Sequence, residues 1–205
     1  MEEVRTGPRA VLSKPLAYVS LQRLLGADRS HRRFAAEYIR ARPGDRVLDI
    51  GCGPGDALRV LPEVAYLGVD LSPEYVASAE QRYGDRGRFR IADVRVDDLA
   101  GEGPFDVILA MGLLHHLDDD TVRGLLAAAR RLLAADGRFV AIDPATVPGQ
   151  HRIAAWLVSL DRGRHVRGPE ELRGLAAESL PGVRATVRHD LLRVPYTHVV
   201  LEAGA

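Results

Sequence analysis

The stretch VLDIGCGPGDAL, residues 47–58, places Gly51, Gly53 and Gly55 directly after an apolar run and before a stretch compatible with a helix. Glycine adopts left-handed backbone conformations that other residues avoid, and its missing Cβ lets a ligand approach the main chain closely. Ligands of open α/β sheets bind at the carboxyl ends of the strands, where the first strand-to-helix turn lies. This glycine turn is therefore a candidate binding site.

The composition is that of one globular domain. The 205 residues are 46% hydrophobic and 27% charged, with a formal net charge of zero, which suits a single core. The longest apolar run, residues 107–114, is far shorter than the roughly 18 residues of a membrane helix. The first residues lack the layout of a secretory signal and Cys52 is the only cysteine, so we expect a cytoplasmic protein. Because the arginines are scattered, we expect a small-molecule partner, with no nucleic acid and no membrane.

Short β-type runs alternate with helical stretches, which predicts a doubly wound α/β sheet. Ser72 before Pro73 is a favoured pair for entering a helix, and the acidic run 118–120 suits the positive end of another. We expect strands at residues 46–50, 65–70, 88–93, 105–110 and 137–143, and helices at residues 56–61, 73–83 and 121–135.

Two flanking regions do not follow this alternation. Residues 15–40 look helical and are expected to pack as an N-terminal cap. Residues 169–180 are expected to form a helix, and residues 183–188 and 196–202 to form an antiparallel hairpin at the edge of the sheet. The predicted fold is thus Rossmann-like, mostly parallel, with an antiparallel C-terminal edge hairpin and an N-terminal helical cap.

Two common nucleotide-binding patterns do not fit the glycine turn. The dinucleotide fingerprint requires glycine at position 56, where Asp56 stands, and this disfavours a nicotinamide cofactor. The phosphate-loop pattern requires a lysine after its second glycine, but Lys14 is the only lysine in the chain. What remains is an acid, Asp49, followed by glycines at alternate positions.

This pattern resembles the first motif of the class I S-adenosylmethionine-dependent methyltransferases. Further stretches resemble later motifs of the family in the same order: residues 68–72 at the end of the second strand, residues 92–94 at the adenine motif, and FDVILAMGLLHHLDD, residues 105–119, after the fourth strand. The resemblance covers residues 45–143 and implies S-adenosylmethionine as cofactor. The LLHHL segment points to the small-molecule, ubiquinone-biosynthesis-like group. We accordingly expect a single domain over residues 1–205, divided into a cap (1–44), a cofactor-binding core (45–143) and a substrate-side region (144–205).

The resemblance implies roles for individual residues toward the cofactor. Asp49 would bind the ammonium of the methionine part, directly or through water, while the glycine turn cradles that part. Asp70 would accept both ribose hydroxyls, and Asp93 would accept a hydrogen bond from the adenine amine. The other cofactor candidates are Leu71 and Val94 on the two sides of the adenine, Ala110 and Met111 through their backbone at the methionine end, and Tyr18 on the cap.

Methyl transfer is an in-line displacement, so alignment supplies much of the catalysis and a base is needed only for a protonated nucleophile. His115 and His116 are the candidate bases, and the alternative is that they hold the loop through hydrogen bonds to the backbone. The chain contains no asparagine, which excludes the Asn-Pro-Pro-Tyr signature of amino-methylating enzymes and the ligand set of the metal-dependent catechol type. We expect no metal.

Acceptor specificity is expected on the cap and after the fifth strand. Arg162 and Arg167 together would suit a carboxylate or phosphate, although a solvated surface explains them equally well. The flanking segments resemble those of small bacterial methyltransferases of secondary-metabolite or surface-polysaccharide gene sets. The alternative function is cofactor binding without methyl transfer, and the sequence leaves the oligomeric state open. The substrate-side candidates are Gln22, His151, Asp161, Arg162 and Arg167.

Overall fold

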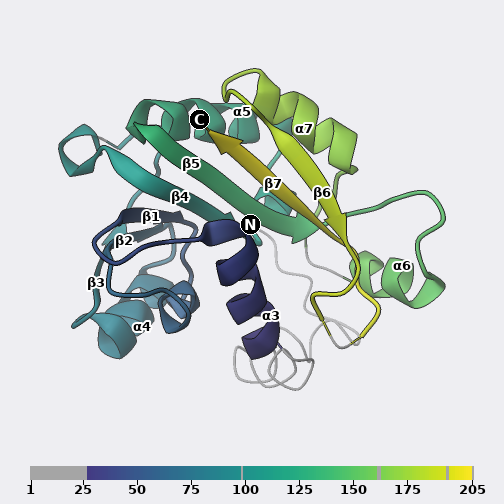
Figure 1. Cartoon of the computed structure of the whole chain (residues 1–205), viewed down its shortest axis with the longest axis horizontal. Coiled ribbons are helices and arrows are strands. Elements are labelled where there is room, and N and C mark those ends of the chain that lie inside the picture. The colour runs from purple at the N-terminus through teal and green to yellow at the C-terminus, as the bar shows by residue number, and fades with distance from the viewer. Residues whose placement is uncertain (1–26, 98, 161–162, 193, 205) are drawn as a thin grey trace.

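The computed structural model describes residues 27–97, 99–160, 163–192 and 194–204. Seven strands form one sheet in the order β3-β2-β1-β4-β5-β7-β6 (Figure 1). Neighbouring strands run parallel except for β7, which is antiparallel to both β5 and β6. The strands are β1 (Arg46–Ile50), β2 (Ala65–Asp70), β3 (Gly87–Ile91), β4 (Phe105–Met111), β5 (Leu133–Pro144), β6 (Arg184–Arg188) and β7 (His198–Gly204). This confirms the predicted mostly parallel sheet with an antiparallel pairing at its C-terminal edge.

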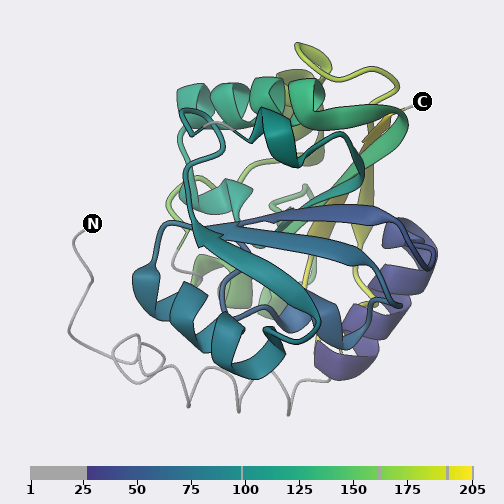
Figure 2. The same cartoon turned by 90° about the vertical axis from the view of Figure 1, so that its left-hand side faces the viewer.

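Helices cover both faces of the sheet (Figure 2). One face carries α5 (Asp119–Leu132) and α7 (Pro169–Ala177); the other carries α3 (Ala27–Phe34), the π-helical segment η1 (Ala35–Ile39), the 3-10 turn η2 (Asp56–Arg59) and α4 (Pro73–Tyr83). Shorter elements are the 3-10 turns η3 (Ala100–Glu102) and η4 (Leu114–His116), and α6 (Arg152–Ser159) projects beyond the end of β5. None of the described helices is long and apolar enough to cross a bilayer.

The central strands are apolar on both faces because helices cover both. In β1, Val47 packs into the cluster beneath α3 and α4, whereas its neighbour Leu48 packs into the cluster beneath α5 and α7. The same alternation holds in β4, where Val107 and Ile108 are both fully buried on opposite faces. Strands of this kind belong inside a doubly wound sheet.

Both predicted helices have the expected polar residue at their N-terminus; α4 begins at the predicted residue, whereas α5 begins at Asp119, two residues before the predicted start, and ends at Leu132. The Ser72 hydroxyl accepts a hydrogen bond from the Tyr75 N–H at 3.3 Å, and Pro73 begins α4. The Asp118 carboxylate accepts from the Thr121 N–H at 2.8 Å at the start of α5. These caps fix where the chain enters each helix after leaving the site edge of the sheet.

Several boundaries differ from the predictions. The helix expected at residues 56–61 is the single turn η2, which follows the left-handed Gly55 and precedes Pro62, so that the chain has no room to extend it. The strand β5 begins at Leu133, directly after α5, where Leu133 pairs with Phe105. The structure also contains α6, which was not predicted. Of the expected N-terminal helix at residues 15–40, the part before residue 27 lies outside the described residues, and the helix expected at 169–180 ends at residue 177.

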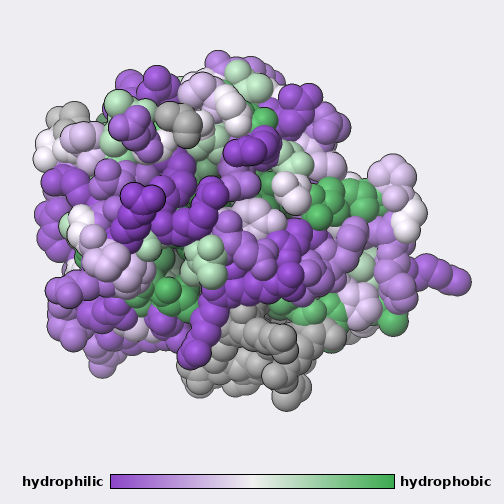
Figure 3. Space-filling model, viewed as in Figure 1, coloured by the Kyte–Doolittle hydropathy of each residue, from purple (hydrophilic) through white to green (hydrophobic). Residues whose placement is uncertain are grey.

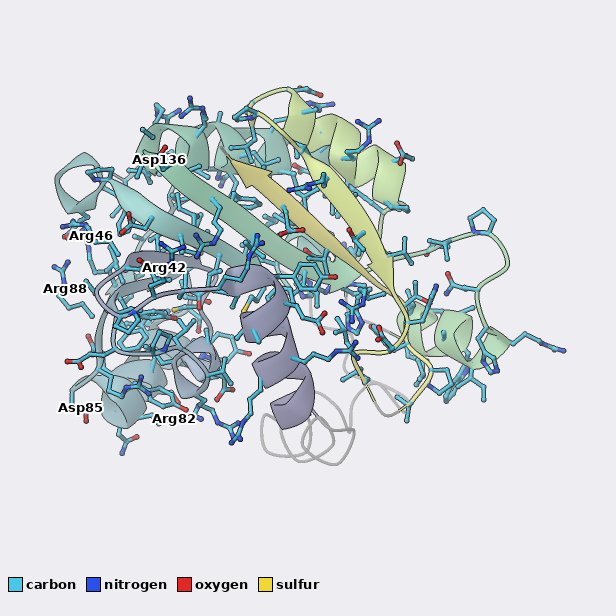
Figure 4. The ribbon with its side chains drawn as sticks, viewed as in Figure 1. Arg42, Arg46, Arg82, Asp85, Arg88 and Asp136 are labelled. Atoms are coloured by element: carbon cyan, nitrogen blue, oxygen red, sulfur yellow. The ribbon has the colours of Figure 1, made fainter. Side chains whose placement is uncertain are left out.

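Four of the charged side chains labelled in Figure 4 mark the edge opposite the site. Arg42, Arg46, Arg88 and Asp136 lie near the amino ends of the parallel strands, on the left of the view. The carboxyl ends of β1, β4 and β5 point the other way, toward α6. The candidate site is therefore sought at that second edge.

Candidate functional site

The strands β1 and β4 diverge at their carboxyl ends. Their last paired residues are Asp49 and Leu109, although β4 continues to Met111. After β1 the chain turns toward β2 instead, since the N–H groups of Gly51 and Cys52 both donate to the Val69 carbonyl. The sheet order reverses at this point, because β2 and β3 lie on one side of β1 and β4 on the other. Ligands of open α/β sheets bind at such a reversal.

The three glycines of the turn all adopt left-handed backbone conformations, with φ of 70° at Gly51, 52° at Gly53 and 79° at Gly55. A Cβ on Gly51 would lie 2.8 Å from Leu113 Cδ1, so this position also needs the missing side chain for packing. A Cβ on Gly53 would meet no atom within 4 Å. Open space therefore borders the main chain at Gly53.

Asp49 is a buried acid below this turn. Its side chain is 2% exposed, and its Oδ2 accepts a hydrogen bond from the Tyr66 hydroxyl at 2.6 Å. Burial raises the pKa of Asp49 to about 7, the Tyr66 hydrogen bond opposes the rise, and the charge of Asp70 adds to it. Within the described part of the chain, Asp49 Oδ1 is buried and has no hydrogen-bond partner. A ligand that brings a cationic donor to this oxygen would satisfy it.

Asp70 ties the end of β2 to the glycine turn. Its Oδ2 accepts from the Gly53 N–H at 3.0 Å, and its Oδ1 accepts from the Ser72 N–H at 2.8 Å. Each carboxylate oxygen can accept more than one hydrogen bond. The carboxylate is thus held in one orientation and keeps capacity for a ligand's hydroxyl groups.

The third acid, Asp93, lies two residues beyond the end of β3 rather than closing it. The Arg95 guanidinium clamps it, with Nε 2.9 Å from Oδ1 and Nη2 2.6 Å from Oδ2, and this pairing lowers the pKa of Asp93. Exposed apolar surface lies nearby, since Leu71 is 64% exposed and Ile91, which pairs with Asp70, is 57% exposed. Ile91 was missed in the sequence because its apolar side chain was counted as part of the strand.

Val94 does not lie where the sequence interpretation put it. Its side chain is buried in the core cluster beneath α5 and leaves almost no surface to pack against an adenine ring. Ala110 is likewise fully buried, so it could contact a ligand only through its main chain, as expected, and Met111 beside it is half-buried. The exposed apolar side chains near Asp93 are therefore Leu71, Ile91 and Val96, whose N–H donates to the Asp93 carbonyl.

The two candidate bases have opposite environments. His115 is buried, and its Nδ1 lies 2.6 Å from Asp143 Oδ1, which also accepts a hydrogen bond from the His115 backbone N–H at 3.1 Å. His116 is exposed, with its ring centroid 4.0 Å from that of His115. Sequence reasoning missed Asp143 as a functional partner, because nothing local relates it to a residue 28 positions earlier.

The segment 163–167 packs on the loop that carries these histidines. A Cβ on Gly163 would lie 2.0 Å from His115 Cδ2, and the His165 N–H donates to the His115 carbonyl at 3.0 Å. Arg167 is 5% exposed and donates to the carbonyls of Leu114 and Leu117 at 2.9 and 2.7 Å.

Arg167 also donates from Nε and Nη2 to the Asp119 carboxylate at 3.0 and 2.7 Å, and from Nη1 to the His165 carbonyl at 3.1 Å. This placement contradicts the expectation that Arg167 faces a substrate anion, because protein groups already occupy all three nitrogens of its guanidinium. Its expected partner Arg162 lies outside the described residues, as do Asp161, Tyr18 and Gln22.

Of the predicted acceptor residues, His151 lines an open pocket of about 460 Å³ at the same edge of the sheet. Its walls are the loop after β5, the first turns of α6 and the loop between β6 and β7. The lining residues of the last loop were not predicted, and they include His189, Leu192, Val194 and Tyr196.

Cys52 lies inside the turn but is buried, and a Cβ on Gly68 would lie 2.8 Å from its sulfur. Burial raises the pKa of the Cys52 thiol above its ordinary value. The geometry agrees with the interpretation of Cys52 as a packing residue, since a reactive cysteine needs a lowered pKa.

Part of this chain is similar in sequence to known proteins. Residues 48–139 match the model of a methyltransferase domain family. A ubiquinone/menaquinone biosynthesis C-methyltransferase of Geotalea uraniireducens is 34% identical over 142 residues, which are 63% of this chain and 59% of the relative. A 27-O-demethylrifamycin SV methyltransferase of Amycolatopsis mediterranei is 35% identical over 55% of this chain and 43% of its own length. The chain thus spans less than two thirds of the length of these relatives.

Among solved structures, a TehB-like S-adenosylmethionine-dependent methyltransferase of Corynebacterium glutamicum superimposes with a TM-score of 0.63 at 21% identity, over 91% of this chain and 95% of that one. At this identity the likeness concerns the fold. The family match, in contrast, includes the glycine turn, Asp70, Asp93 and the loop of the two histidines. Residues 48–139, which carry most of this site, are therefore similar to the methyltransferase domain family.

Proposed function

We propose that this protein transfers a methyl group from S-adenosylmethionine to a small-molecule acceptor. The observation that carries the proposal is the pair of acids around the left-handed glycine turn, with the unpartnered Asp49 Oδ1 on one side and the fixed Asp70 carboxylate on the other. Bound S-adenosylmethionine supplies a methyl group on a sulfonium, and the acceptor's lone pair forms the new bond to carbon as the sulfur–carbon bond breaks.

The residues at the turn suit the cofactor's functional groups. Asp49 Oδ1 would receive the methionine ammonium, directly or through water, and the charge would favour the ionised carboxylate. The open space beside Gly53 would admit the methionine part against the main chain. Asp70 would accept the ribose hydroxyls with charge-assisted hydrogen bonds. Asp93, held by Arg95, would accept from the adenine amine, and Leu71 and Ile91 supply the apolar surface.

The histidines are assigned different roles in this proposal. Because Nδ1 of His115 faces a carboxylate, it carries the ring proton, and the bond fixes both the ring and the loop. The burial of His115 favours a positioning role through Asp143. The exposed His116 is then the better placed candidate to take a proton from the acceptor as the new bond forms, where that acceptor carries one.

For the acceptor we propose a secondary metabolite. The support is the rifamycin-modifying relative of Amycolatopsis mediterranei, whose name specifies an oxygen acceptor. The pocket beside His151 adds support, because its volume lies in the range of roughly 300–1,000 Å³ that small-molecule sites occupy.

The test has two stages. Calorimetry with S-adenosylmethionine and its demethylated product should show binding, and Asp70→Ala should weaken that binding by tenfold or more, since two charge-assisted hydrogen bonds are lost. The absence of binding would exclude the proposal. Incubation with a pool of hydroxylated natural products should then release demethylated cofactor, detected by mass spectrometry. Binding without release would instead favour the alternative, a cofactor-binding protein that transfers no methyl group.

A further inference from the structure

The pocket beside α6 lies sideways from the methyl-transfer position, and this offset constrains the shape of the acceptor. The methionine end of the cofactor belongs at the carboxyl ends of β1 and β4. The pocket lies beyond β5 and β7, between the loop after β5 and the loop joining β6 to β7. At about 4.8 Å between neighbouring strands, two strand steps separate the two places by about 10 Å. A single-ring acceptor is too short to occupy both.

The two places are nevertheless joined by contiguous structure. The Gly112 N–H donates to the Ile142 carbonyl, and His115 bonds to Asp143, so the loop after β4 lies against the end of β5. The chain after β5 continues into the pocket wall, since the Ala145 N–H donates to the Thr197 carbonyl before β7. The loops that border the two places are therefore in contact along this edge.

The wall of the pocket is mixed in character. Ala154, Leu192, Val194 and Pro195 supply apolar surface, and the described lining residues carry neither a carboxylate nor a guanidinium. Figure 3 shows apolar residues, coloured green, among polar ones on the right of the molecule in the region of α6. Such a wall favours an uncharged, largely apolar body.

One polar group in this wall lacks a partner. The Gln150 side-chain oxygen accepts a hydrogen bond from the Val147 N–H at 2.7 Å, and this bond fixes which end of the amide is nitrogen. Within the described part of the chain, the Gln150 Nε2 is buried and has no hydrogen-bond partner. A second donor is provided by His151, whose Nδ1 accepts from the Ile153 N–H, so that the neutral ring carries its proton on Nε2. An unsatisfied buried donor is stabilised by a ligand oxygen.

We propose that this pocket holds the distal end of an elongated, uncharged, multi-ring acceptor, and that the Gln150 side-chain amide donates a hydrogen bond to an oxygen on that end. The inference rests on the proposed methyl transfer, because the reacting atom of the same molecule must reach the ends of β1 and β4. It assigns acceptor specificity to Gln150 and to the β6–β7 loop.

The experiment measures how tightly three probes bind to the full chain when the chain is saturated with S-adenosylhomocysteine. These are 2,6-dihydroxyanthraquinone, with an oxygen at each end of three linear rings, 2-hydroxyanthraquinone, which lacks the distal oxygen, and phenol. We expect the first to bind several-fold more tightly than the second, as one added hydrogen bond predicts, and phenol to bind far more weakly than both.

Gln150→Glu keeps the oxygen for the Val147 N–H and removes the amide donor, and Gln150→Leu removes both. Each should abolish the advantage of the dihydroxy probe at pH 6, where the hydroxyl groups of the probes stay protonated, while Gln81→Glu, on the exposed side of α4, should retain it. Unchanged S-adenosylhomocysteine affinity and melting temperature show that the variants are folded.

The outcomes separate the two proposals. If S-adenosylhomocysteine binds but no three-ring probe does, or if phenol binds equally well, the acceptor inference is wrong and methyl transfer stands. If both Gln150 variants keep the preference for the distal oxygen, Gln150 is not its partner and the inference is overturned. If S-adenosylhomocysteine itself does not bind, the proposed function fails first.

Discussion

Replacing Asp49 by asparagine should remove the pH dependence that this buried acid imposes on stability. Burial raises the pKa of Asp49 from 3.8 to about 7. At 1.36 kcal/mol per pKa unit, keeping the carboxylate ionised in the folded protein costs about 4 kcal/mol. Between these two pH values the folded chain holds a proton that the unfolded chain has released. The stability that the neutral Asp49 contributes is therefore complete below pH 3.8 and is lost as the pH rises through 7.

Asparagine does not titrate and retains an oxygen for the Tyr66 hydroxyl, but its NH₂ group lacks an acceptor, which costs about 1–3 kcal/mol. We therefore expect Asp49→Asn to be less stable than the native chain by about 1–3 kcal/mol at pH 4 and more stable by a similar amount at pH 8. The same variant should bind S-adenosylhomocysteine at least tenfold more weakly, because the ammonium loses its counter-charge.

The assay is urea unfolding followed by circular dichroism from pH 4 to pH 8.5, without cofactor. Other titrating groups are common to both proteins, so the difference in unfolding free energy isolates position 49. Asp85→Asn, an exposed carboxylate in the turn before β3 (Figure 4), is the control and should change stability by less than about 0.5 kcal/mol. A difference between Asp49→Asn and the native chain that stays constant with pH would refute the reasoning.

Three further predictions concern the turn and the loop of the histidines. Gly53→Ala should cost only about 1–2 kcal/mol of stability, because the added Cβ meets no atom and only the left-handed backbone is strained. The variant should nevertheless bind S-adenosylhomocysteine at least tenfold more weakly by calorimetry. Unchanged affinity would mean that the ligand lies elsewhere. Arg167→Met should destabilise the protein by about 1–3 kcal/mol in urea unfolding, because the carbonyls of Leu114 and Leu117 lose their donor while Asp119 is half exposed. A variant of native stability that only raises the KM for an acceptor would restore the substrate role. His116→Ala should keep the melting temperature within about 2 °C of the native value, as expected for an exposed position. It should lower kcat for a protonated acceptor by about 10²-fold or more. A kcat equal to that of the native chain at all pH values would show that His116 is not the base.

Local signals in the sequence were sufficient for the part of the fold that surrounds the cofactor. The Ser72–Pro73 pair predicted the start of α4 correctly because the cap and the proline act within one turn. The glycine turn was predictable because a left-handed backbone restricts the residue type at each position. The assignment of Asp49, Asp70 and Asp93 to cofactor groups came from the resemblance and stays a prediction until binding is measured.

The substrate side depended on contacts between distant residues. Arg167 was interpreted as a substrate-binding or solvated cation because its partners, the carbonyls of the 114–117 loop, lie about 50 positions earlier and have no sequence signature. The helix α6 was missed because its N-cap is the ring nitrogen of His151, an unusual cap, and because Ile153 and Trp156 remain exposed. The start of β5 at Leu133 was missed because Asp136–Gly137 was interpreted as the end of a helix, whereas it lies within the strand.

The position of β7 has a consequence for how this protein is made. The last strand in sequence is an internal strand of the sheet, paired with β5 on one side and with β6 on the other. Until residues 198–204 have left the ribosome, the edge of β5 has no partner and β6 has no strand to join it to the sheet. A nascent chain therefore exposes the unpaired edge of a long, apolar strand until synthesis of the strand is complete, the condition in which edge-to-edge association between chains is most favoured.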